Sequence, residues 1–157
     1  MKNILVPAAA LSLLLLLFAT SCVGRPGAAT QSPQDTPFDP GADRSTLVAH
    51  TWTFSKMFGQ DIAAGEGREL PYLTFTADGK VQGHTGCNPL NGTYTLEDGL
   101  RIRFADLATG LAFCEDVPYE NQLLEALNTA DNYTLNDGTL SLNKARMAPL
   151  AILQAAD

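Results

Sequence analysis

The most reactive side chains of this sequence belong to three cysteines and two histidines, His50 and His84. Cys87 stands shortly after His84, and Cys114 follows further along the chain. An imidazole and one or two thiolates could bind a metal ion, or a thiolate and an imidazole could form a nucleophile–base pair. In an oxidising compartment the same two cysteines could instead form a disulfide. Their chemistry therefore depends on where the chain resides.

The N-terminus indicates export. Lys2 gives the positive charge of a signal peptide's n-region. The apolar run Ala8–Phe18 has the length of an h-region and is too short to span a membrane as a typical transmembrane helix. Small residues, Ala19-Thr20-Ser21, then precede Cys22. We predict a lipoprotein signal peptide over residues 1–21 and acylation of Cys22, although Ala19 replaces the usual Leu and ordinary cleavage is the alternative. The expected location is the bacterial cell envelope, at the periplasmic face of the outer membrane, with the membrane as a partner through the N-terminal lipid.

Export favours a disulfide between Cys87 and Cys114, worth roughly 3–4 kcal/mol in the chain-entropy model. Two small buried thiols are the alternative. A metal site from His84, Cys87 and Cys114 would not survive the disulfide, and no nearby residue would orient His84 as a base for Cys87. We therefore predict no metal, no cofactor and no catalytic residue, and expect that the protein is not an enzyme.

Other polar residues add no catalytic constellation. Glu115 and Asp116 are adjacent, so in a strand they would point to opposite faces, and they more plausibly favour the start of a following helix. The Gly65-x-Gly67 pair lacks the remainder of a phosphate-binding loop. The formal net charge of −7 argues against nucleic acid and against electrostatic attachment to anionic lipid.

Residues 22–45 are predicted to be the lipidated cysteine and a disordered tether rich in Pro and Gly. Only Val23 and Phe38 are larger apolar residues in the stretch Val23–Asp43, too few to offset the entropy of ordering. A flexible tether of about 20 residues would span roughly 25 Å. Residues 46–157 then form one β domain.

Within this domain short strands are separated by tight turns. His50–Phe58 alternates like a half-buried strand, and Gly59–Leu70 is expected to be a loop. Three turns with Asx-Gly predict hairpins, at Asp78-Gly79, Asp98-Gly99 and Asn136-Asp137-Gly138. The apolar runs Leu107–Phe113 and Leu150–Leu153 are expected to be further strands.

One segment has helical spacing, with Tyr119, Leu123, Leu124 and Leu127 on one face and Glu120 pointing elsewhere. The predicted fold is therefore mainly β with one helix, a small antiparallel, lipocalin-like barrel or a strongly curled sheet. Six aromatic residues are expected in its core, with a small apolar pocket as the alternative: Trp52, Phe54, Tyr72, Phe75, Tyr94 and Phe104.

A cluster of Gly, Asn and Cys residues is the richest local motif. The signature-like residues of this loop are Gly83, Gly86, Cys87, Asn88 and Gly92, with Tyr94 after them. This pattern resembles the META family, which includes heat-shock lipoproteins, and the resemblance extends through most of Thr51–Leu153. The chain departs from the family at Pro89, and in Thr109–Cys114, where the usual Met is absent.

The resemblance implies a lipocalin-like β-barrel fold, an envelope location and roles in stress or drug tolerance, with no catalytic residues. We expect a non-enzymatic, lipid-anchored module that binds an envelope protein or a small apolar ligand. The alternative is an inhibitor or accessory subunit of an envelope enzyme, with Gly59–Leu70 or Gly83–Gly92 as its contact loop.

Overall fold

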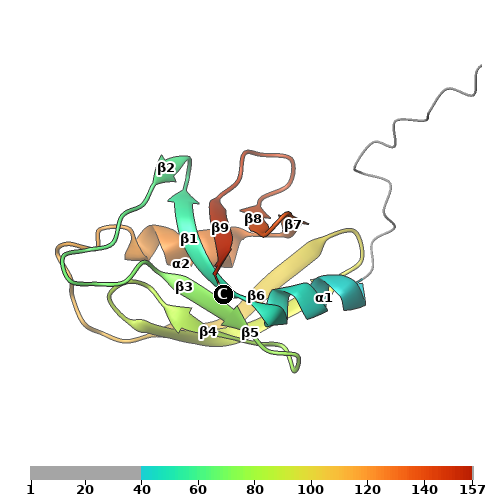
Figure 1. Cartoon of the computed structure of the whole chain (residues 1–157), viewed down its shortest axis with the longest axis horizontal. Helices are drawn as coiled ribbons and strands as arrows, with labels where there is room; N and C mark the ends of the chain where they lie inside the picture. The colour runs from blue at the N-terminus through green and yellow to red at the C-terminus, as the bar shows by residue number, and fades with distance from the viewer. Residues whose placement is uncertain (1–39, 157) are drawn as a thin grey trace, which may run out of the picture. The chain divides into compact units, whose positions relative to one another are not determined.

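The computed structural model describes residues 40–156, which form a mainly β domain with two helices (Figure 1). The predicted signal peptide and Cys22 lie outside the described residues. The elements follow the order α1 (Pro40–Ala49), β1 (Thr51–Met57), β2 (Gln60–Asp61), β3 (Tyr72–Phe75), β4 (Lys80–His84), β5 (Pro89–Glu97), β6 (Arg101–Thr109), α2 (Glu120–Thr129), β7 (Asn132–Asn136), β8 (Thr139–Asn143) and β9 (Ala151–Ala156).

The three predicted hairpins are confirmed. Antiparallel ladders join β3 to β4, β5 to β6 and β7 to β8. Their turns place Gly79, Gly99 and Gly138 at φ of +86°, +77° and +73°. Glycine takes this left-handed backbone without the steric cost of a Cβ, which is why the Asx-Gly pairs reveal these turns from sequence.

The strands form one antiparallel sheet in the order β2-β1-β3-β4-β5-β6-β7-β8-β9, and a further pairing joins β1 to β9. The β1–β9 ladder is long, running from Thr51 opposite Ala156 to Met57 opposite Ala151. The β6–β7 contact is a single pair, Arg101 with Asn132. The sheet is thus strongly curled and its two sides meet, as the sequence predicts.

The core fills the inside of this curled sheet. Trp52 and Phe54 on β1 are completely buried, and the rings of Phe75 and Tyr94 meet edge to face at 4.9 Å. Tyr72 and Phe104 are only half-buried. Helix α2 packs on β1 and β6 and adds three buried side chains, Leu123, Ala126 and Leu127.

The sequence predicts one helix in the domain, and the structure has a second one, α1. Pro40 opens it, a residue well suited to a first helical turn. Its Leu47 is fully buried, the Leu47 carbonyl accepts a hydrogen bond from Trp52 Nε1 at 2.9 Å, and the Tyr133 hydroxyl donates to Asp43 at 2.6 Å. These tertiary contacts make residues 40–45 helical, within the range predicted to be the tether.

The expectation of a separate strand over Leu107–Phe113 is correct only for residues 107–109, which end β6, and wrong for residues 110–113. β6 runs without interruption from Arg101 to Thr109 and ends before Gly110. Its register against β5 shifts between Asn91 and Thr93, where Asp106 takes a φ of +54°. This bulge lets one strand span what the sequence pattern divides into two.

Among the described residues, no helix is long and apolar enough to cross a membrane.

Candidate functional site

The signature turn, defined here as residues 83–88, connects β4 to β5 and is closed by a buried threonine. Thr85 and Asn88 are 0% and 3% exposed. Thr85 Oγ1 accepts hydrogen bonds from the backbone amides of Asn88 (2.8 Å) and Cys87 (3.2 Å). The Thr85 amide donates in turn to the Asn88 carbonyl at 2.8 Å. The turn therefore satisfies its own buried backbone groups.

Glu120, the first residue of α2, completes this network. Its Oε1 accepts hydrogen bonds from the Thr85 hydroxyl at 2.7 Å and from Asn88 Nδ2 at 2.9 Å. Glu120 lies off the apolar face of α2, as helical spacing predicts. Nothing in the local sequence identifies its partner, which is 32 residues away. The carboxylate ties the helix to the signature turn.

Asn88 also holds the segment of residues 110–114, which we call the braced loop. Its Oδ1 accepts a hydrogen bond from the Ala112 amide at 3.0 Å, and its Nδ2 donates to the Ala112 carbonyl at 2.9 Å. The Gly110 amide donates to the Pro89 carbonyl at 3.3 Å. A Cβ on Gly110 would lie 2.4 Å from Asn88 Oδ1, so only glycine fits there.

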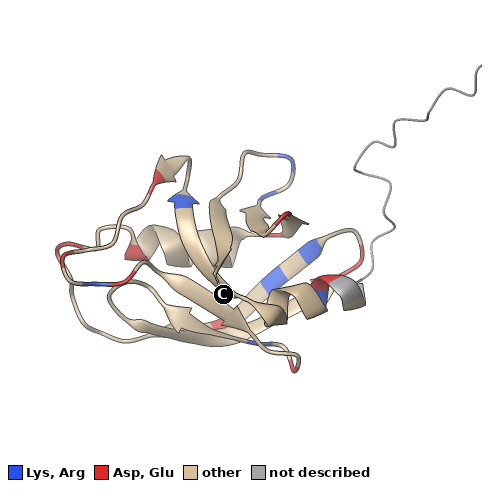
Figure 2. Cartoon of the chain, viewed as in Figure 1, with Lys and Arg blue, Asp and Glu red and all other residues tan. Residues whose placement is uncertain are grey.

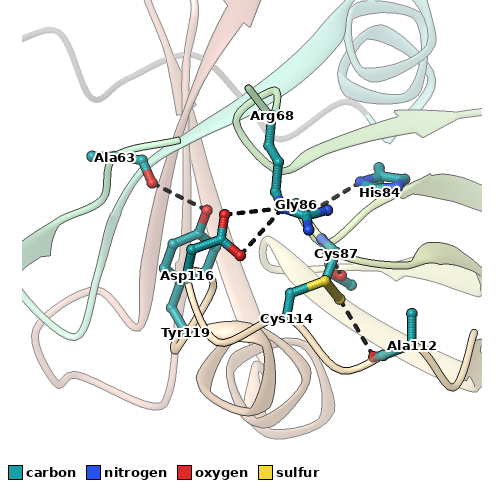
Figure 3. A network of polar contacts seen from close by, with 10 residues as sticks. Ala63, Arg68, His84, Gly86, Cys87, Ala112, Cys114, Asp116 and Tyr119 are labelled. Atoms are coloured by element: carbon teal, nitrogen blue, oxygen red, sulfur yellow. Dashed lines mark hydrogen bonds and ion pairs between the residues drawn. A yellow bond between two sulfur atoms is a disulfide. The ribbon is translucent and has the colours of Figure 1, made fainter. Parts of the chain in front are cut away.

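The predicted disulfide between Cys87 and Cys114 is confirmed, with an S–S distance of 2.04 Å, and it fixes the other end of the braced loop (Figure 3). The metal site and the Cys87–His84 nucleophile considered from sequence would both need a thiolate, which the bridged sulfurs do not supply. His84 Nδ1 accepts a hydrogen bond from the Gly86 amide at 3.0 Å, and its ring stacks with that of Tyr72. In the described part of the chain, no cluster of three or more His, Cys, Asp or Glu residues could hold a metal ion.

The side chains at the tip of the braced loop are fully in solvent. Leu111 is 102% exposed and Phe113 is 86% exposed, while the backbone of Ala112 between them is bonded inward to Asn88. Three of the loop's five residues are thus fixed to the domain, and two large apolar side chains point away from it. A pattern of apolar residues in the sequence suggests a strand here and gives no indication of this exposure.

The surroundings of the braced loop are acidic. Asp116 accepts from Arg68 Nε at 3.0 Å, and the hydroxyl of Tyr119 donates to the Ala63 carbonyl at 3.1 Å (Figure 3). Burial, and then the nearby charge of Asp116, raises the pKa of Tyr119. These contacts hold the loop after β2 against the segment before α2. Figure 2 shows acidic residues on both of these segments, and four are exposed: Glu66, Glu69, Glu115 and Asp116, of which Asp116 pairs with Arg68.

A second apolar feature lies where β1 ends and β9 begins. Here a hollow of about 280 Å³ opens to solvent, and Phe58 and Met147 line it at 40% and 67% exposure. In contrast to the braced loop, these side chains contact a shared depression and the residues before β9 carry no disulfide. Met147 is therefore an exposed apolar residue outside the braced loop.

Comparison with known proteins decides the family. The family model of the META domain matches residues 45–157. This range includes the signature turn, the braced loop, Asn88 and the Cys87–Cys114 disulfide. The chain belongs to the META domain family. The resemblance seen in the Gly, Cys and Asn pattern is thereby confirmed.

Two solved structures share the fold of this META domain. One, determined by NMR, is a protein from Burkholderia xenovorans with 22% identity and a TM-score of 0.57, covering 84% of this chain and 97% of that one. The other is a crystal structure of a DUF4847 family protein from Bacteroides vulgatus, with 16% identity and a TM-score of 0.53 over 73% of this chain and 96% of that one. No curated protein matches the chain.

Proposed function

We propose that this META protein is a non-enzymatic, lipid-anchored module of the bacterial envelope that binds another envelope protein through the braced loop. The observation that carries the proposal is the complete exposure of Leu111 and Phe113 on a backbone that is fixed at Gly110, Ala112 and Cys114. Large apolar side chains held in water mark contact sites for partners.

Rigidity supports the same interpretation. A loop that is already ordered loses little conformational entropy when a partner covers it, so more of the gain from burying apolar surface remains as affinity. The interior supports a protein partner over a small apolar ligand carried inside, because Trp52, Phe54 and Tyr133 are fully buried core residues. Packed side chains leave such a ligand less room.

The membrane attachment in this proposal rests on the N-terminal sequence. Cys22 follows small residues and an apolar run, so an acylated Cys22 and a tether would place the domain within reach of partners in the periplasm. Two or more acyl chains give stable attachment. A role in stress or drug tolerance would follow if the partner acts on the cell wall or on misfolded proteins.

Site-specific photo-crosslinking in the producing cells tests the proposal. A benzoylphenylalanine is placed at position 113, and the same probe at position 147 is the control on another exposed apolar residue. We expect a discrete protein adduct from position 113 only, found in the membrane fraction and lost from it in Cys22→Ala. Absence of any adduct, or identical adducts from both positions, would contradict the proposed contact surface.

A second function is favoured by the way in which the same loop is fixed. A braced loop with exposed apolar side chains is suited to block the cleft of an enzyme, and the partner would then be an envelope hydrolase that this protein inhibits. The observation in its favour is that the bracing contacts lie on both sides of Phe113.

A further inference from the structure

The two anchors of the braced loop, Ala112 and Cys114, flank one residue, Phe113, whose carbonyl forms the peptide bond to Cys114. On one side, Ala112 is hydrogen-bonded through both its amide and its carbonyl to the buried side chain of Asn88. On the other side, Cys114 is bonded covalently to Cys87, with a Cα–Cα distance of 5.9 Å. Phe113 itself is 86% exposed between them.

We propose that the braced loop is a substrate-like inhibitory loop for a serine protease whose primary specificity pocket is apolar, with Phe113 as the residue that enters the pocket. This inference rests on the proposed function, because it assigns the class of protein that the loop binds. A hydrophobic slot beside the catalytic serine accepts an aromatic side chain in proteases of the chymotrypsin type.

The arrangement of the loop suits inhibition better than cleavage. Hydrolysis of the Phe113–Cys114 bond would add one water, leaving a carboxylate on Phe113 and an amine on Cys114. The disulfide would hold that amine and Asn88 would hold the residue before Phe113, so the two new ends would stay in place. Product release would then be slow and the reverse reaction favoured, because the amine is held at high effective concentration.

Charge argues against two other occupants of this surface. The exposed carboxylates of Glu66, Glu69 and Glu115 border the region, and the chain carries a formal net charge of −7. An anionic bilayer and a second copy of this chain would both be repelled. A protease cleft with neutral or basic borders would not.

Inhibition assays on the purified, oxidised protein test the inference, with chymotrypsin as the probe with an apolar pocket and trypsin as the probe with an acidic pocket. We expect an inhibition constant for chymotrypsin below about 1 μM, with the loop still intact after hours. Phe113→Ala should weaken this inhibition by at least about 30-fold, as for an interface hot spot. Met147→Ala, at another exposed apolar position, should leave it unchanged.

A change of inhibitor specificity is the most discriminating experiment. Phe113→Lys should lose inhibition of chymotrypsin and gain inhibition of trypsin, because the new side chain pairs with the acidic pocket. Position 113 is exposed, so these variants should keep the unfolding midpoint of the wild-type protein, which checks their integrity.

Several outcomes would overturn the inference. They are an absence of inhibition at about 100 μM, cleavage after Phe113 as fast as in an unstructured peptide, or Phe113-dependent binding to phosphatidylcholine vesicles without inhibition. If a cross-linked protein partner is still obtained from position 113, the binding module stands and only the protease class is wrong. If that partner is absent as well, the proposed function fails with it.

Discussion

Two segments outside the sheet, α1 and the braced loop, are attached to it by different chemistry. Helix α1 is held by the buried side chain of Leu47 and by the hydroxyl of Tyr133, which donates to Asp43. The braced loop buries neither of its large side chains and is held by the Cys87–Cys114 disulfide and by Asn88. One attachment uses apolar burial and a titratable group; the other uses a covalent bond and a neutral amide.

This difference separates a segment whose large apolar side chain belongs to the core from one whose large apolar side chains lie in solvent. In α1 the large apolar side chain is packed in the core, so its removal should lower the free energy of unfolding. In the braced loop the backbone is bonded to the domain, and the large apolar side chains remain exposed and accessible to the partner that we propose. Substitutions in the two segments should therefore divide into effects on unfolding and effects on binding.

The largest expected effect is on the braced loop's covalent anchor. Replacing Cys87 and Cys114 together by Ser should lower the free energy of unfolding by about 3–4 kcal/mol, because the bridge spans 27 residues and its loss restores entropy to the unfolded chain. Urea denaturation followed by the fluorescence of Trp52 measures it, since this single tryptophan is fully buried and reports on unfolding of the core. Wild-type protein in reductant is the control and should approach the variant; equal stability of all three would contradict the prediction.

The next effect concerns α1. Leu47→Ala should cost about 3 kcal/mol, since it leaves a cavity at a fully buried position. The matched change Leu124→Ala, at a half-buried position on α2, should cost less than about 1.5 kcal/mol. Thermal unfolding compares the two, and a smaller loss at Leu47 than at Leu124 would mean that α1 is not anchored by its core residue.

Asn88→Ala should cost about 2 kcal/mol, because it removes a buried amide that hydrogen-bonds the backbone of Ala112 and the half-buried carboxylate of Glu120. Asn91→Ala, at an exposed position on the same β5 strand, is the control and should stay within about 0.5 kcal/mol of wild type. Hydrogen exchange at the Ala112 amide should accelerate only in the Asn88 variant. Unchanged exchange there would show that the disulfide alone orders the loop.

The smallest effect is on the titratable anchor of α1. Burial, and then the hydrogen bond to Asp43, raises the pKa of Tyr133. A raised pKa in the folded state stabilises the fold below the ordinary tyrosine pKa of about 10 and loses that contribution as the pH rises above it. Tyr133→Phe should therefore cost about 1 kcal/mol at pH 7 and make the fall of stability above about pH 10 shallower.

Urea titrations between pH 7 and 11 measure this dependence. Tyr72→Phe is the control, because Tyr72 is only half-buried and its ring stacks with that of His84. A residual slope is expected from Tyr94 and Tyr119, whose pKa values are also raised by burial. A slope equal to that of wild type would contradict the role of Tyr133.

The parts of the fold that sequence reveals are those set by local chemistry. The hairpin turns depend on glycines at positive φ, and α2 on an apolar stripe of residues that lie near one another in the chain. Helix α1 escapes prediction because its anchors are distant: Asp43 and Tyr133 are 90 residues apart. A helix with one core side chain has no periodicity to detect.

The site shows the same division. The pairing of Cys87 with Cys114 could be predicted from an export-like N-terminal sequence and from the two cysteines that remain after Cys22. The roles of Asn88 and Glu120 depend on which surfaces the curled sheet brings together. Leu111 and Phe113 resemble core residues in sequence, and only tertiary structure shows that both face solvent. Apolar composition alone does not distinguish a strand from a contact loop.

The long ladder between β1 and β9 has a consequence for the order of events during biosynthesis. The first full strand of the sheet cannot complete its hydrogen bonds until the last strand, Ala151–Ala156, is present. Pairs so far apart in sequence form slowly, since the loop between them must close first. A growing chain would therefore stay open until synthesis of the domain is nearly finished, and the native sheet would form only after the last strand has been made.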